Sequence, residues 1–261
     1  MNHPATTARG HVLRNRILAG VCVATVAALA TMAACSNDTI APDASHEVDG
    51  PSVPVGSGSA HTFITTSGSH ATGIGIALTD GVFTNLPDSM AEYQLPLPSG
   101  TSLPPWDHAT LNWNPQGHPP PNIYMVPHFD FHFYTIPVSA QMAIAGGPDT
   151  ATVPAKYMPQ DYESEVMSVP AMGVHWNDSL SAEWKGHPFD RTLIYGFSHG
   201  QLNFIEPMIT VDYLKQHPNV TAHVKQPAAF QAAGEYPDSY SIRYDASEHI
   251  TRVALDSLVA H

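Results

Sequence analysis

Apolar residues occur along the chain in short runs that alternate with polar residues, and many of the 24 prolines separate these runs. Short runs of this kind, bounded by proline, glycine or asparagine, are typical of β-strands. Helices are expected to be few and short. The pattern predicts strands at 62–66, 72–78, 93–97, 123–136, 173–176, 192–196, 202–208, 241–245 and 251–259, and short helices at 80–85, 137–145, 179–184 and 210–216.

These strands follow one another without a regular alternation of strand and helix, which favours antiparallel pairing. The sequence therefore predicts a mainly β fold, a single antiparallel β-sandwich or barrel-like domain, over residues 61–261. Residues 102–121 are rich in Pro, Trp and Asn. This composition predicts a long loop. Loops of this length in a compact domain are usually functional or act as lids.

The first 34 residues have the pattern of a bacterial lipoprotein signal peptide. Arg9, Arg14 and Arg16 precede an apolar stretch, 17–34, whose length and flanks fit a secretory signal better than a permanent membrane span. The stretch ends in Met-Ala-Ala followed by Cys35, which resembles a lipobox. We expect cleavage before Cys35 and attachment of a lipid to it. The alternative is an ordinary cleavable signal with a chance cysteine.

Residues 35–60 contain Pro, Gly, Ser and Asp with few large apolar side chains, so a flexible linker is expected there. The lipid would make the membrane a partner of the protein. Its predicted location is the cell envelope outside the cytoplasm, in the periplasm or at the outer membrane if the cell has two membranes.

Charge and cysteine content narrow the classes of function. Three of the ten basic residues and none of the 23 acidic ones lie in residues 1–34, which leaves a net charge of −16 for the rest. Such a chain repels phosphate backbones, so we expect no nucleic-acid partner. Cys22 lies within the signal peptide and Cys35 would be lipidated, so we expect no disulfide in the domain.

One segment, residues 126–134, has the clearest chemical pattern. Side chains alternate across a strand, so Phe129, Phe131 and Phe133 are expected on one face, in a core. His128, Asp130, His132 and Tyr134 then share the other face. Residues two apart on a strand are roughly 6.6 Å apart, so His128 and His132 reach a common ion only if the strand bends.

Further candidate ligands lie elsewhere in the chain. His175 and Glu206 each lie in a short apolar run, and His118 lies at the end of the long loop. A buried carboxylate such as Glu206 needs a partner, because burial of a lone charge is costly. A set of His, Asp and Glu ligands suits zinc first, or another first-row divalent ion, and nearby Met172 and Met208 leave copper open. The alternative is a hydrogen-bonded polar network that only fixes strand register.

Residues 196–200 match the Gly-x-Ser-x-Gly pattern of serine hydrolases. A nucleophile elbow requires a strand before the serine and a long helix after it. The residues that follow, 201–207, alternate and then reach a proline, which favours a second strand. We therefore interpret 197–200 as a hairpin turn and Ser198 as a residue without catalytic function.

Four segments together resemble a bacterial family of uncharacterised secreted proteins and lipoproteins, a domain of unknown function. They are residues 112–119, the run Val-Pro-His-Phe-Asp-Phe-His-Phe-Tyr at 126–134, Gly-Val-His-Trp at 173–176, and Glu-Pro-Met at 206–208. The likeness extends from about residue 62 to residue 259. It implies one β-rich extracytoplasmic domain and supplies neither an activity nor a metal.

Three hypotheses on function follow from the sequence. The first is a membrane-anchored lipoprotein with a His/Asp/Glu metal-binding or polar ligand pocket. The second is a metal-dependent, hydrolase-like enzyme with Asp130 or Glu206 as general base. The third is a structural envelope protein with inert histidines. The sequence leaves open the small-molecule ligand and association into a homo-oligomer.

Overall fold

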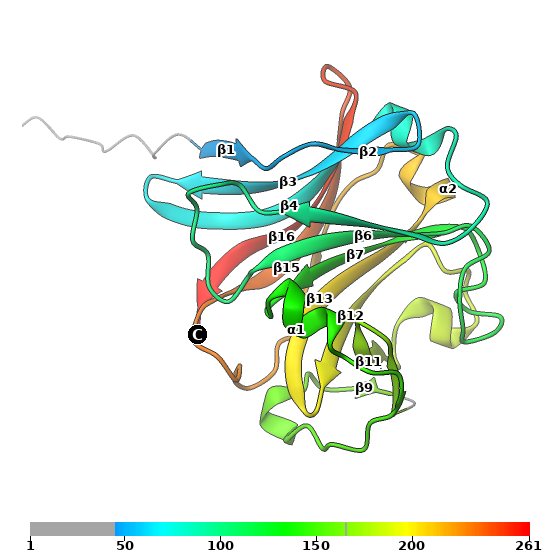
Figure 1. Ribbon diagram of the computed structural model, residues 1–261, viewed down its shortest axis with the longest axis vertical. Coiled ribbons are helices and arrows are strands. Elements are labelled where there is room, and N and C mark those ends of the chain that lie inside the picture. Colours follow the sequence, from blue (N-terminus) through cyan, green and yellow to red (C-terminus); the bar gives the residue numbers. More distant parts are fainter. Residues whose placement is uncertain (1–44, 165) are drawn as a thin grey trace, which may run out of the picture. The chain divides into compact units, whose positions relative to one another are not determined.

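A computed structural model describes residues 45–164 and 166–261, which form two antiparallel β-sheets packed face to face (Figure 1). The first sheet has seven strands, in the order β1-β3-β4-β16-β15-β14, with β2 paired to β3. Its strands are β1 (Ser45–Asp49), β2 (Val53–Val55), β3 (Gly58–Ser67), β4 (His70–Thr79), β14 (Asn219–His223), β15 (Glu235–Asp245) and β16 (Ile250–Ala260).

The second sheet has nine strands, in the order β5-β6-β7-β13-β12-β11-β10-β8, with β9 paired to β11. Its strands are β5 (Ala91–Pro96), β6 (His108–Asn114), β7 (His128–Tyr134), β8 (Gly147–Pro148), β9 (Tyr162–Glu163), β10 (Met167–Val169), β11 (Gly173–Asp178), β12 (Arg191–Ser198) and β13 (Gln201–Thr210).

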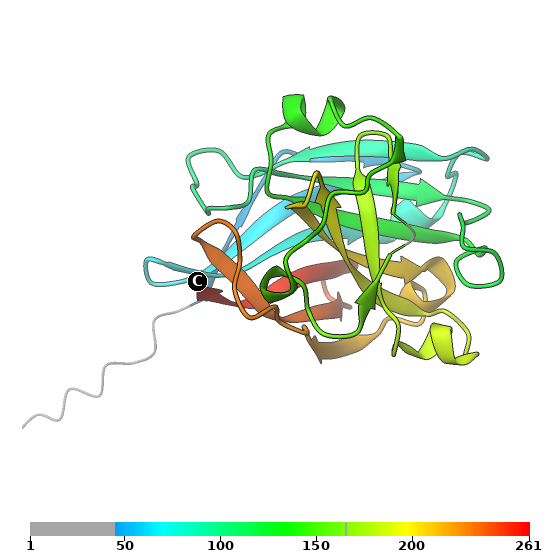
Figure 2. The same ribbon diagram turned by 90° about the horizontal axis from the view of Figure 1, so that it is seen from below.

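The predicted β-sandwich is confirmed, and the barrel alternative is excluded because the two sheets remain separate. Figure 2, a view turned by 90°, shows the blue, cyan and red strands of the first sheet beside the green and yellow strands of the second. Helices are short, as predicted. They are α1 (Val138–Met142) and α2 (Val211–Leu214), with the 3-10 turns η1 (Asp80–Phe83), η2 (Ala155–Tyr157) and η3 (Ala182–Lys185).

The core between the sheets is built from one face of each. Ile74, Ile76 and Val253 come from the first sheet, and Phe131 and Ile205 from the second; all five side chains are fully buried. Alternation places these residues on the inner faces. Strands β7 and β13 lie in the middle of the nine-stranded sheet, so their side chains are shielded by neighbouring strands on both sides.

The boundary between the linker and the domain differs from the prediction. The expected linker 35–60 contains β1, β2 and the start of β3, so the sheet begins at least by Ser45. The reason is that β1 joins β3 by main-chain pairing while all five of its side chains remain exposed. Composition does not reveal a strand of this kind. The predicted signal peptide, Cys35 and residues 36–44 of the predicted linker lie outside the described residues.

The expected long loop 102–121 was also partly wrong, because it contains β6, all seven residues of which are buried. Its sequence alternates strictly, with Ala109, Leu111 and Trp113 in the core between the sheets. Prolines on both sides obscured this alternation. Similarly, the strand expected at 123–136 begins only at His128.

The hairpin interpretation of 197–200 is confirmed. Strand β12 ends at Ser198, β13 begins at Gln201, and Ser198 pairs with Gln201. The two residues of the turn, His199 and Gly200, have φ values of 50° and 77°. Two consecutive positive φ values are characteristic of the tight hairpin turn that connects antiparallel strands. Across residues 45–164 and 166–261, the structure has no helix with the length and hydropathy needed to cross a membrane.

Candidate metal centres

Strand β7 has aromatic side chains on one face and ionisable side chains on the other, as predicted. Phe129, Phe131 and Phe133 are fully buried in the core between the sheets. The other side of the strand is also buried, since the exposed fractions of His128, Asp130 and His132 are 0%, 4% and 0%. The outer face of the nine-stranded sheet therefore carries ionisable groups in a region that excludes water.

An apolar cover explains this burial. A second hydrophobic cluster lies on the outer face and is separate from the core between the sheets. Its aromatic members contact the histidines: the ring of Phe204 lies 4.7 Å from that of His132, and the ring of Phe189 lies 5.5 Å from that of His128. The cluster comprises Tyr124, Tyr134, Phe189, Ile194, Phe204 and Met208.

Three of the predicted residues meet on three strands of this face. His132 of β7, His175 of β11 and Glu206 of β13 form a group that we call the strand cluster. The Nε2 atom of His132 lies 3.5 Å from Oε1 of Glu206, and that of His175 lies 3.6 Å from Oε2.

Gly196 of β12 makes this approach across four strands feasible. It pairs with His175 on one side and with Phe204 on the other. A Cβ atom at this position would overlap the ring of Phe204. Because glycine leaves this space free, the ring of Phe204 lies over β12 and packs against both His132 and His175.

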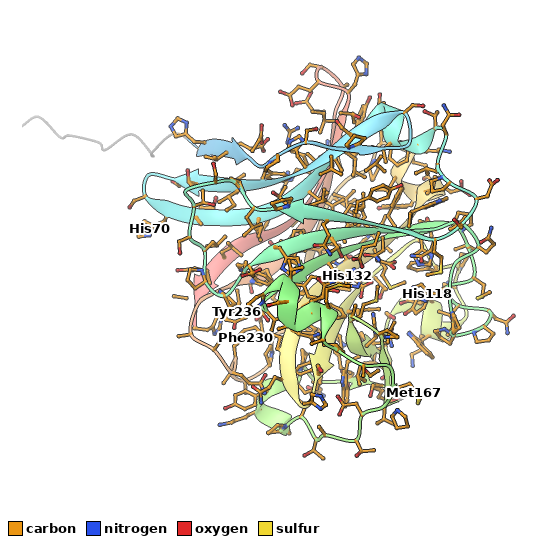
Figure 3. The ribbon with its side chains drawn as sticks, in the orientation of Figure 1. His70, His118, His132, Met167, Phe230 and Tyr236 are labelled. Atoms are coloured by element: carbon orange, nitrogen blue, oxygen red, sulfur yellow. The ribbon has the colours of Figure 1, made fainter. Side chains whose placement is uncertain are left out.

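The other three predicted residues form a separate group, which we call the loop cluster. His128 and Asp130 belong to β7, and His118 lies in the connection between β6 and β7. The Nε2 atom of His128 lies 3.0 Å from Oδ1 of Asp130, and that of His118 lies 3.7 Å from Oδ2. Figure 3 shows His132 near the middle of the sheet and His118 toward its side.

Backbone contacts orient both imidazoles of the loop cluster. The Nδ1 atom of His128 lies 2.7 Å from the carbonyl oxygen of Val126, and that of His118 lies 2.7 Å from the carbonyl oxygen of Pro119. Each Nδ1–H therefore donates to a carbonyl, which directs each Nε2 at Asp130; in the neutral imidazole this Nε2 carries a lone pair. Metal-binding histidines are commonly held in this way.

The two clusters hold most of the unsatisfied polar atoms of the interior. Within residues 45–164 and 166–261, eleven buried side-chain nitrogen or oxygen atoms have no hydrogen-bond partner, and six belong to the clusters. Such atoms are rare in folded proteins, because each forfeits its hydration without replacement. The six atoms are Nε2 of His128, Oδ1 of Asp130, Nδ1 and Nε2 of His132, and Oε1 and Oε2 of Glu206.

Burial also controls protonation in the strand cluster. Desolvation is the larger and repulsion from Asp130 the smaller of two effects that raise the pKa of Glu206 well above its usual value. Desolvation lowers the pKa of His132 to about 3 and that of His175 to about 4. Without a cation, the two histidines are therefore uncharged at neutral pH, and Glu206 holds a proton more readily than an ordinary carboxyl group.

The loop cluster differs because the carboxylate of Asp130 stays ionised. Burial alone would raise the pKa of Asp130, but His128 and His118 outweigh this effect and lower the pKa below its usual range. For His118, burial lowers the pKa, and contacts with Asp130 more than reverse the change and raise it. The two clusters thus have similar donors in different electrostatic environments.

The donor spacing of both clusters suits a metal ion. Tetrahedral zinc, with bonds of about 2.0–2.1 Å, places its ligand atoms roughly 3.3 Å from one another. The four closest contacts between imidazole and carboxylate, 3.0 to 3.7 Å, lie on either side of this value. In each cluster all three donor atoms lie within 4.8 Å of one another. These buried groups can therefore hold a metal ion.

All six residues singled out from the sequence fall into these clusters, but not into one pocket. His128 and His132 belong to different clusters, as the length of a straight strand requires. Sequence reasoning missed Asn114, whose Nδ2 donates to Oδ2 of Asp130 at 2.7 Å and orients that carboxylate. The alternation in β6 was the signal that could have placed Asn114 on the same face.

Comparison of the chain with protein-family models, with curated proteins and with solved structures found no match. The functional assignment therefore depends on the geometry of the clusters.

Proposed function

We propose that the protein is a lipid-anchored protein of the cell envelope that binds a divalent transition-metal ion at the strand cluster. The observation that carries this proposal is the carboxylate of Glu206, whose residue is fully buried. Neither carboxylate oxygen has a hydrogen-bond partner, and each faces the Nε2 atom of a different histidine. A cation between the three groups would satisfy the carboxylate and both Nε2 atoms.

The strand cluster is favoured as the primary site because strands of one sheet supply every ligand. The three strands that carry these ligands, β7, β11 and β13, each pair with a neighbouring strand on both sides. Side chains on a sheet keep their positions better than side chains on loops, so the site would be preorganised. Zinc is our first choice, because two imidazoles and a carboxylate are among its usual ligands; copper is the alternative.

The test is metal analysis of the protein purified without a histidine tag. We expect a bound first-row divalent ion, and at least a tenfold loss of affinity in His175→Ala and Glu206→Gln. Glu183→Gln is the matched control, because Glu183 is also buried but its Oε1 accepts a hydrogen bond from Tyr124. Unchanged metal content in Glu206→Gln would contradict the proposal.

Location at the membrane is proposed from the lipobox sequence that ends at Cys35. Cys35→Ala should release the domain into soluble fractions or leave an uncleaved precursor. Incorporation of labelled fatty acid into the wild-type protein, and not into this variant, is the direct measurement. A wild-type protein without label would contradict lipid anchoring and would leave the metal proposal untouched.

A metal-dependent enzyme is the second candidate, because the strand cluster offers three protein ligands. Catalytic zinc sites commonly have three protein ligands and keep the fourth position for water or substrate. The side chain of His175 is 19% exposed, so one side of the cluster is near solvent. Cobalt-substituted protein distinguishes the two functions: azide should change its visible spectrum if a coordination position is open, and leave it unchanged if the site is closed.

A further inference from the structure

We infer that His118, His128 and Asp130 form a second, separate metal site, whose ion fixes the loop between β6 and β7 over the strand cluster. The binding of this ion is independent of the proposed function. Only its effect on the strand cluster depends on that function.

Convergence of the donors is the first argument. With Nδ1–H of each histidine donated to a carbonyl, two Nε2 atoms and one carboxylate face one another within 4.8 Å. A proton on one imidazole can satisfy only one of these contacts. The Nε2 atom of His128 and Oδ1 of Asp130 lie 3.0 Å apart, yet neither has a partner in hydrogen-bond geometry. Two ligands of one ion have this arrangement.

Separation from the strand cluster is the second argument. His132 follows Asp130 by two residues on β7, and such residues are roughly 6.6 Å apart. No residue is shared between the two groups. Asn114 orients only Asp130, and the ring of Phe189 packs only against His128 among the six ligands. Each cluster therefore has ligands and supporting contacts of its own.

The loop supplies the third argument. His118 connects the loop to Asp130 on β7, and Tyr124 attaches the same loop to β11, three strands away in the sheet. The Tyr124 hydroxyl lies 3.0 Å from Oδ1 of Asn177 on β11 and accepts a hydrogen bond from Nε1 of Trp184. Its ring belongs to the apolar cluster that also contains Phe204, the residue that packs on His132 and His175.

An ion in the loop cluster would therefore tether the loop at its His118 end while Tyr124 tethers the other end. The side chain of His118 is 26% exposed, whereas those of His128 and Asp130 are buried, so release of His118 is the easiest step in opening the cover. We expect the ion in the loop cluster to slow the exchange of the ion in the strand cluster.

The test counts metal ions and measures their release in the full-length protein. Wild type should bind two equivalents of Zn²⁺, and His118→Ala and Asp130→Asn one each. Release of the remaining ion to a chromogenic chelator should be at least threefold faster in His118→Ala. His70→Ala is the control, because His70 is exposed and belongs to neither cluster. It should match wild type in both measurements.

The outcomes distinguish the two proposals. One ion that is lost in Glu206→Gln and kept in His118→Ala would overturn the second site alone. One ion that is lost in His118→Ala and kept in Glu206→Gln would support the loop site and overturn the proposed function. Two ions with an unchanged rate of release in His118→Ala would overturn the tethering role. Binding of no ion would overturn both sites.

Discussion

The two faces of strand β7 are equally buried but make opposite contributions to the protein. Toward the first sheet, Phe129, Phe131 and Phe133 fill the core and leave no polar atom to satisfy. On the outer face, His128, Asp130 and His132 are surrounded by aromatic rings and keep unsatisfied atoms. The inner face stabilises the fold, and the outer face costs stability that a bound ion would restore. This difference is the basis for the proposal that the outer face binds an ion.

The largest expected effect comes from the inner face. Phe131→Ala should lower the free energy of unfolding by about 3–5 kcal/mol, because it removes a large buried side chain and leaves a cavity. Chemical denaturation of the metal-free protein measures the change. Phe131→Leu should lower the free energy of unfolding clearly less, because leucine fills more of the cavity than alanine. If Phe131→Ala lost under 1 kcal/mol, the inner face would not be the stabilising one.

Removal of metal should have the next largest effect, through the outer face alone. An ion present at 100 to 1,000 times its dissociation constant stabilises a protein by roughly 2.7–4.1 kcal/mol. A chelator should therefore lower the melting temperature of the wild-type protein by several degrees. The double variant His118→Ala/Glu206→Gln should show no such shift. An equal shift in both proteins would mean that the chelator acts elsewhere.

Replacing a polar residue of the outer face should reverse the sign of the change in stability. In the metal-free protein, His132→Phe should raise the free energy of unfolding by about 1–2 kcal/mol, because it removes two unsatisfied nitrogens and keeps a ring of similar shape. The same variant should lose the ion of the strand cluster. A strong loss of stability without metal would show that His132 is satisfied in the fold.

The pH dependence of stability in the metal-free wild type and in His132→Phe tests whether the buried histidine causes this difference. Burial lowers the pKa of His132 to about 3 and that of His175 to about 4, whereas an unfolded histidine titrates near 6.5. A lowered pKa contributes stability above pH 6.5 that is lost as the pH falls toward the folded values. Metal-free wild type should therefore become less stable from pH 6.5 to pH 4, and His132→Phe should lose less over that range.

The sequence predicts the two faces of β7 only as far as the pattern within one strand allows. Alternation over 128–134 was enough to place the phenylalanines in the core and the ionisable groups opposite them. The spacing of His128 and His132 already favoured separate ligand sets. The membership of each cluster was not predictable, because it depends on the register of β11, β12 and β13 against β7. It also depends on Gly196, whose missing side chain makes room for Phe204. Likewise, the prolines on both sides of β6 favour a loop and outweigh the alternation within the strand.

The smallest effect is expected at the end of β12, where the deep burial of the sheet ends. Ser198 is only half-buried and ends the strand before the two-residue turn. Ser198→Ala should change the free energy of unfolding by less than about 0.5 kcal/mol, as is usual for residues outside the core. Gly200→Ala in the same turn should be more costly, because its φ of 77° disfavours alanine. A serine-directed phosphonate probe should not label the wild-type protein. Stoichiometric labelling at Ser198 would instead place a nucleophile at the edge of this sheet, and a serine hydrolase would then replace metal binding as the leading function.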